Sequence, residues 1–352
     1  MKRLSHKQQQ WLLNKSRREL LRRKKRNKHK ARNSLTNKST VLQKDSVSCG
    51  YTYIATAPNN FSIRNNSDET VKYFSLVHSL IAKANPKDQI FFDFSHVENL
   101  TADAIMYIIA LMNNDKKLNA FDIRCSGNIP ASDAAKRLME ECGFYQYVRS
   151  RRFINRSTTN DRIKIHRGQQ PENDFAKELC EFVWDKSQGV IDRLSTKRLF
   201  AVIIEMMYNA CQHAYDIHSN PSMFGNWYSY AEDLDGIVRF VFFDTGLGIP
   251  STIKKTLLEK AKDIIWDNDS GYIASALRGE HRTQTGNNYR GKGLPEILES
   301  VTDGSMRSLQ IFSGKGVCYV EADGNIIEQN LEYTFKGTMY VWEISKGGVT
   351  TC

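Results

Sequence analysis

The chain divides into two regions by the pattern of its apolar and polar positions. Between residues 50 and 150, short apolar runs alternate with runs in which apolar residues recur every three or four positions. The short runs predict strands at 51–55, 60–64, 89–94 and 121–126, with the first two pairing as a hairpin across 57–60. The longer runs predict helices that begin near 66, 101 and 132. We therefore expect a β/α unit over residues 49–150.

Residues 151–347 carry longer elements. Strands are expected at 162–166, at 239–243 and from 336 onwards, and helices at 174–186, at 199–215 and from near Leu294. Residues 251–290 mix short helical runs with a polar, glycine-bearing run, which is long for a plain connection and favours a functional loop. Residues 1–48 are expected to form an arm with one short helical run, followed by a linker.

One polar stripe interrupts the apolar helix predicted at 199–215. Glu205, Asn209 and His213 are spaced four residues apart, so they follow one face of that helix. Three glycine-bearing segments come after it, and they read Asp-Thr-Gly-Leu-Gly-Ile-Pro at 244–250, Arg-Gly-Lys-Gly-Leu-Pro-Glu at 290–296 and Lys-Gly-Thr at 336–338. The stripe alone is compatible with an exposed helix face, but the ordered set of four segments is more specific.

This ordered set resembles the GHKL superfamily, whose ATP-binding fold is shared by DNA gyrase, heat-shock chaperones, histidine kinases and MutL. The resemblance covers residues 160–345. It implies an α+β fold in which a two-layer α/β sandwich of the GHKL (Bergerat) type follows the smaller unit and the basic arm. It also implies that the chain binds ATP together with Mg²⁺.

The resemblance implies a role for each matching residue. Glu205 would be the base that activates an attacking water or hydroxyl, and Asn209 would offer its amide oxygen to Mg²⁺. Asp244 would accept the exocyclic amine of adenine, and Thr338 would add a hydroxyl near the base. The other positions expected around the base and the phosphates are Gly246, Gly248, Ile249, Gly291, Lys292, Gly293 and Leu294. His213 is interpreted as a packing residue at the helix end.

Residues 93–105 resemble the central strand-loop-helix of STAS domains, the fold of anti-anti-sigma factors. In that family the run ends in Asp-Ser-Ser-Gly, and its second serine takes a phosphate from a GHKL partner kinase. Here the four positions read Thr101-Ala-Asp103-Ala, so an aspartate stands at the phosphoacceptor position and Thr101 is the remaining hydroxyl. The resemblance implies a protein-docking or pseudosubstrate unit.

Charge and cysteine content narrow the class of protein. The net charge is +11, and residues 1–33 alone hold fourteen Lys or Arg and one acid, so the basicity belongs to the arm. Such an arm suits nucleic-acid phosphates or an anionic membrane surface, and it is equally compatible with a solubilising tail. The seven cysteines form no Cys-x-x-Cys pair, which argues for reduced thiols in the cytoplasm and against zinc or disulfides. The longest apolar run, 105–112, is too short to span a membrane, and no signal peptide is evident.

Three functions fit these observations. The favoured interpretation is an Mg-dependent ATPase that acts as a nucleotide-gated switch, works as a homodimer and contacts nucleic acid through residues 1–33. The second is an anti-sigma-type serine/threonine kinase or regulator that uses the STAS-like unit for docking. The third is an ATP-binding module without hydrolysis, which the presence of both Glu205 and Asn209 disfavours.

Overall fold

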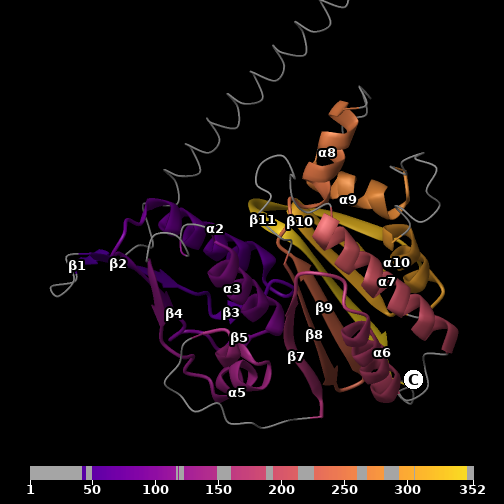
Figure 1. Ribbon diagram of the computed structural model, residues 1–352, viewed down its shortest axis with the longest axis horizontal. Coiled ribbons are helices and arrows are strands. Elements are labelled where there is room, and N and C mark those ends of the chain that lie inside the picture. The colour runs from indigo at the N-terminus through magenta and orange to yellow at the C-terminus, as the bar shows by residue number, and fades with distance from the viewer. Residues whose placement is uncertain are drawn as a thin grey trace, which may run out of the picture.

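The computed structural model describes residues 42–44, 50–115, 118, 123–148, 160–187, 193–212, 226–259, 268–280, 293–304 and 306–346. They form a four-stranded, a five-stranded and a two-stranded sheet with helices packed on them, a mixed α+β arrangement (Figure 1). We call the described residues of 42–148 the N-terminal unit and those of 160–346 the C-terminal unit. Among the described residues, no helix combines the length and apolar character needed to cross a membrane.

The N-terminal unit is built on a four-stranded sheet in the order β1-β2-β4-β6. β2, β4 and β6 run parallel, and β1 joins the edge antiparallel to β2. Its strands are β1 (Leu42–Lys44), β2 (Tyr51–Thr56), β3 (Asn60–Phe61), β4 (Gln89–Asp93), β5 (Asn99–Leu100) and β6 (Arg124–Gly127). Its helices are α2 (Ser67–Lys83), α3 (Ala102–Asn114), α5 (Asp133–Glu141) and the short 3₁₀-helix η1 (Phe144–Gln146).

Two expectations for this unit are wrong. The segments at 51–55 and 60–64 do not form a hairpin, because β2 pairs in parallel with β4, and the two-residue β3 pairs with β5. A parallel β2–β4 pair needs a crossover, and α2 supplies it while burying its apolar face against the unit's core. Residues 42–44, expected within the linker, form the edge strand β1. Three residues are too few to show a strand period.

The expected helices of the N-terminal unit are confirmed. α2 buries its predicted apolar face of Val71, Phe74, Val77 and Ile81. The side chain of Ser132 accepts the backbone N–H of Ala135 and so caps α5.

The C-terminal unit is built on a five-stranded sheet in the order β10-β11-β9-β8-β7, and each neighbouring pair is antiparallel. Its strands are β7 (Arg162–Gly168), β8 (Trp227–Leu234), β9 (Ile237–Asp244), β10 (Ser308–Val320) and β11 (Ile326–Ser345). Its helices are α6 (Asn173–Ser187), α7 (Arg193–Gln212), α8 (Ile249–Glu259), α9 (Asp269–Leu277) and α10 (Gly293–Thr302). α6, α7, α9 and α10 supply the apolar side chains that cover one face of this sheet (Figure 1).

The N-terminal unit covers the opposite face of the five-stranded sheet (Figure 1). Along β9, Phe240 and Phe242 pack into the helix-side core, whereas Val241 and Phe243 share one core with α2 and α3. The ring of Tyr107 on α3 stacks on that of Phe243, with centroids 5.3 Å apart. This two-sided burial explains why β9 reads as a continuous apolar run instead of an alternating one.

A chain of ion pairs joins the two units beside this shared core. Arg239 lies between two carboxylates, with its Nη1 2.8 Å from Glu232 Oε1 and its Nη2 3.0 Å from Glu343 Oε1. Arg64 of the N-terminal unit pairs with the same Glu343. Arg162 connects Glu232 to Glu141 of the N-terminal unit, at 3.5 and 3.0 Å. Since these side chains are largely shielded from solvent, the units form one continuous interior.

Candidate functional site

The helix α7 carries the acidic end of the candidate site. Glu205 is partly buried on α7, and Asn209, one turn later, is exposed. The start of α10 approaches this helix closely, because a Cβ added at Gly293 would lie 2.8 Å from Cδ of Glu205. The start of α10 therefore lies directly against the Glu205 carboxylate, and a side chain at 293 would require that carboxylate to shift. The fold thus brings together two of the sequence motifs.

The end of β9 carries a second carboxylate. Asp244 pairs across the sheet with Thr338 of β11, and its Oδ1 accepts the backbone N–H of Gly246 at 2.8 Å. Burial raises the pKa of the Asp244 carboxyl to about 6, against the hydrogen bonds from Gly246 and from the Thr338 hydroxyl, which lower it. An acceptor held half-buried in this way suits a ligand N–H group.

Two glycines allow the turns around Asp244 to meet. Gly337 has φ +91°, and a Cβ there would lie 2.1 Å from the carbonyl oxygen of Asp244. Gly248 has φ +84°, and its Cβ would lie 2.8 Å from Oγ of Ser313 and 3.2 Å from the carbonyl oxygen of Gly337. The loop after β9 and the stretch of β11 before Thr338 therefore pack backbone against backbone, which side chains would prevent.

Ser313 on β10 connects these turns and was not anticipated from the sequence. Its fully buried hydroxyl accepts the backbone N–H of Ile249 at 2.9 Å and donates to the carbonyl of Gly337 at 3.1 Å. The same oxygen lies 3.1 Å from the hydroxyl of Thr338. Ser313 follows the apolar residues Ile311 and Phe312, but only the pairing of β10 with β11 gives it partners.

Glu205 and Asp244 both act electrostatically on one tyrosine on the helix side of the five-stranded sheet. Thr338 and Tyr340 alternate along β11 with residues that face the N-terminal unit, so both point toward the helices. Burial raises the pKa of the Tyr340 hydroxyl, and the charges of Asp244 and then Glu205 raise it further. Both carboxylates therefore lie within electrostatic range of one tyrosine.

Some expected site residues lie elsewhere or outside the described part of the chain. Leu294 packs its side chain against the helix-side core, so only its backbone is available to a ligand. Ile249 likewise packs on that core and contributes its N–H to Ser313. Gly291, Lys292 and His213 are outside the described residues.

The donor groups on α7 fit a hard cation beside phosphate. The carboxylate of Glu205 and the amide of Asn209 are oxygen donors one helical turn apart, and Asn209 is accessible from solvent. Mg²⁺ prefers oxygen ligands and is commonly held by one or two protein groups together with substrate phosphates.

The STAS-like segment has a structural role in the N-terminal unit. Asp103 is 3% exposed, and its Oδ1 accepts the N–H of Ile63 at 3.0 Å and the hydroxyl of Thr101 at 2.5 Å. Burial raises the pKa of the Asp103 carboxyl, and its hydrogen bonds and the nearby arginines oppose that rise. These contacts fix the start of α3, which lies on the opposite face of the five-stranded sheet from α7.

Comparison of the chain with models of known protein families gave no match, and comparison with curated protein sequences gave none either.

Proposed function

We propose that the chain binds ATP with Mg²⁺ on the helix side of the five-stranded sheet, as GHKL proteins do, and hydrolyses it slowly as a nucleotide-gated switch. One observation carries the proposal. The group formed by Asp244, Thr338 and Ser313 lies on the same face of the sheet as the contact between Glu205 and Gly293. The charges of both carboxylates raise the pKa of the Tyr340 hydroxyl on that face. Under this proposal, sequence segments more than 100 residues apart would form the two ends of the nucleotide site.

Each end has a distinct task. At the adenine end, the Asp244 carboxylate would accept the exocyclic N–H, and the Thr338 hydroxyl would lie near the base. At the phosphate end, Asn209 would hold Mg²⁺, which offsets triphosphate charge when bound. Glu205 would take a proton from the attacking water. The backbone N–H groups at the start of α10 would face the phosphates.

The position of the STAS-like segment argues against transfer of a phosphoryl group from the ATP site to the N-terminal unit of the same chain, and so supports hydrolysis. Asp103 and Thr101 lie on the covered face of the sheet and Glu205 on the other. The Thr101 hydroxyl is also engaged with Asp103. A kinase activity would therefore act on another molecule, and the N-terminal unit would serve as a docking element.

The basic arm, the homodimer and contact with nucleic acid stay predictions. If residues 1–33 neutralise nucleic-acid phosphates, their deletion should leave ATP binding intact and remove salt-dependent nucleic-acid binding. Nucleic-acid binding that survives the deletion would assign the contact to the folded units.

The test of the proposed function uses γ-labelled ATP and Mg²⁺ with the full chain, with and without DNA or RNA. We expect free phosphate to be released, and we expect Asn209→Ala to abolish and Asp244→Asn to weaken ATP binding. Unchanged affinity in both variants would overturn the nucleotide site. Label retained on protein, in place of free phosphate, would make the chain a kinase.

A further inference from the structure

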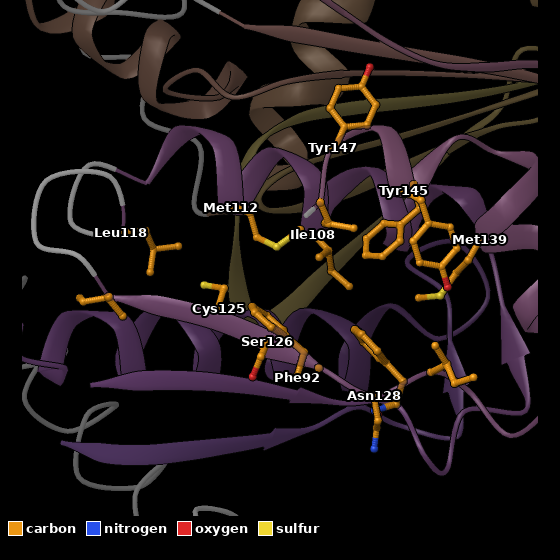
Figure 2. Close-up of a pocket in the computed structure, with 16 residues that line it drawn as sticks. Phe92, Ile108, Met112, Leu118, Cys125, Ser126, Asn128, Met139, Tyr145 and Tyr147 are labelled. Carbon is orange, nitrogen blue, oxygen red and sulfur yellow. The ribbon is translucent and has the colours of Figure 1, made fainter. Parts of the chain in front are cut away.

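The N-terminal unit holds a cavity of about 640 Å³ that the proposed ATP site does not use. It lies between α3 and the edge of the four-stranded sheet (Figure 2). Met112 and Ile108 point into it from α3, Phe92 and Cys125 line it from β4 and β6, and Met139 and Tyr145 close one end (Figure 2). Well-packed interiors hold few voids larger than a water molecule, whereas pockets for small molecules measure roughly 300–1,000 Å³.

The walls of this cavity are mostly apolar and present no charged side chain among the described residues. Phe92, Ile108 and Met139 are at most 4% exposed and form its inner wall, whereas Cys125 and Gly127 on β6 are exposed, so the cavity opens to solvent along that strand. None of the described residues that line the cavity is Asp, Glu, Lys, Arg or His. Burial raises the pKa of the Cys125 thiol to about 11, so this wall group is also neutral near pH 7.

The polar groups at the rim are few and already engaged. Asn128 Oδ1 accepts the N–H of Phe94 at 2.6 Å, and its Nδ2 donates to Asp93 at 2.6 Å. The hydroxyl of Ser126 accepts a hydrogen bond from Gln89. A carboxylate or ammonium entering the cavity would lose its hydration without a charged partner, which costs several kcal/mol.

We propose that this cavity is a binding site for a small, uncharged, largely apolar molecule. The proposal goes beyond nucleotide binding and gives the N-terminal unit a ligand of its own. Helix α3 lies between that ligand and the C-terminal unit, because it presents Ile108 and Met112 to the cavity and Tyr107 to Phe243, the residue before Asp244.

Titration of the full chain with the neutral fluorescent probe N-phenylnaphthylamine tests the proposal. We expect saturable fluorescence enhancement, displacement of the probe by decanol, and at least tenfold weaker displacement by decanoate. Absence of saturable binding would overturn the site. Decanoate that competes as well as decanol would overturn its assignment to uncharged ligands.

Cavity-filling variants locate the probe. Met112→Trp fills the cavity from α3 and Cys125→Phe fills it from β6, and each should weaken probe binding more than tenfold. Met112→Leu conserves volume and should bind the probe as the wild type does. Two filling variants allow for one that fails to fold, as judged by circular dichroism. A folded filling variant that binds the probe with unchanged affinity would show that the probe sits elsewhere and contradict the proposal.

Discussion

The two faces of the five-stranded sheet are built from alternate residues of the same strands, yet they do different things. The face toward the N-terminal unit is closed by aromatic stacking, as between Tyr107 and Phe243, and by the ion pairs around Arg239. The face toward the helices is apolar over most of its area but becomes polar where β9 ends, at Asp244 and its partner Thr338 on β11. One sheet therefore separates a stabilising interface from a candidate chemical site, and side-chain alternation keeps the two apart.

The largest expected effect is on the helix face. Glu205→Gln should lower ATP turnover by roughly 10²–10⁴-fold while ATP affinity stays near that of the wild type, because the amide cannot accept the proton of water. Glu299→Gln on α10, an exposed carboxylate near the same helix pair, is the matched control and should turn over normally. Steady-state phosphate release and nucleotide titration measure the two quantities. Undiminished turnover in Glu205→Gln would remove its assignment as the base.

The next effect is on the interface face. Glu343→Ala leaves Arg239 and Arg64 without their shared partner in a largely buried place. We expect the free energy of unfolding to fall by about 3–5 kcal/mol. Glu69→Ala breaks an exposed ion pair with Lys72 and should change the free energy of unfolding by less than about 1 kcal/mol. Equal, small losses in chemical denaturation would show that the ion-pair chain does not hold the units together.

A smaller effect concerns the protonation of Asp244. Its pKa in the fold, about 6, lies above that of an unfolded aspartate, so the protonated form favours folding and this contribution is lost as pH rises through 6. Asp244→Asn should therefore raise the free energy of unfolding by about 1–3 kcal/mol near pH 7.5, and by much less near pH 4.

The same carboxyl should make ATP binding dependent on pH. The exocyclic N–H of adenine needs an ionised acceptor, so the ATP affinity of the wild type should fall about tenfold from pH 7 to pH 5. Titration of the phosphates changes the affinity of both proteins, so the change measured with Asp244→Asn is subtracted. Isothermal titration at both pH values measures this difference. Parallel pH profiles for the two proteins would contradict a role for Asp244 at the base.

The smallest effect concerns Ser313. Ser313→Ala leaves the N–H of Ile249 without its acceptor in a buried turn, which costs about 1–3 kcal/mol of local stability. We expect ATP affinity to fall about five- to tenfold, because the backbone around Asp244 would be held less firmly and part of the lost stability would reduce binding. Ser300→Ala removes a buried hydroxyl that bonds only within α10 and should leave affinity unchanged. Equal affinities in the two variants would make Ser313 a packing residue without influence on the site.

Local patterns predicted the helices better than the strand pairings. α2, α3, α5, α6 and α7 lie where apolar periodicity indicated, because each helix shows its buried face within one segment. The pairing of β2 with β4, and not with the segment at 60–64, depends on residues nearly forty positions apart. The polar residues Glu205, Asn209, Asp244 and Thr338 were named from motifs, whereas Ser313 has no motif and is evident only from its contacts.

The sequence by itself determined most of the helices and the residue types offered for chemistry, because spacing acts over a few residues, whereas strands β8 and β10 were not predicted. Only the tertiary structure decided that the N-terminal unit closes one face of the five-stranded sheet and leaves the helix face to the candidate site. It also decided that Asp103 is buried and accepts the backbone N–H of Ile63. These outcomes depend on which distant surfaces bury apolar area together, and no local pattern specifies that choice.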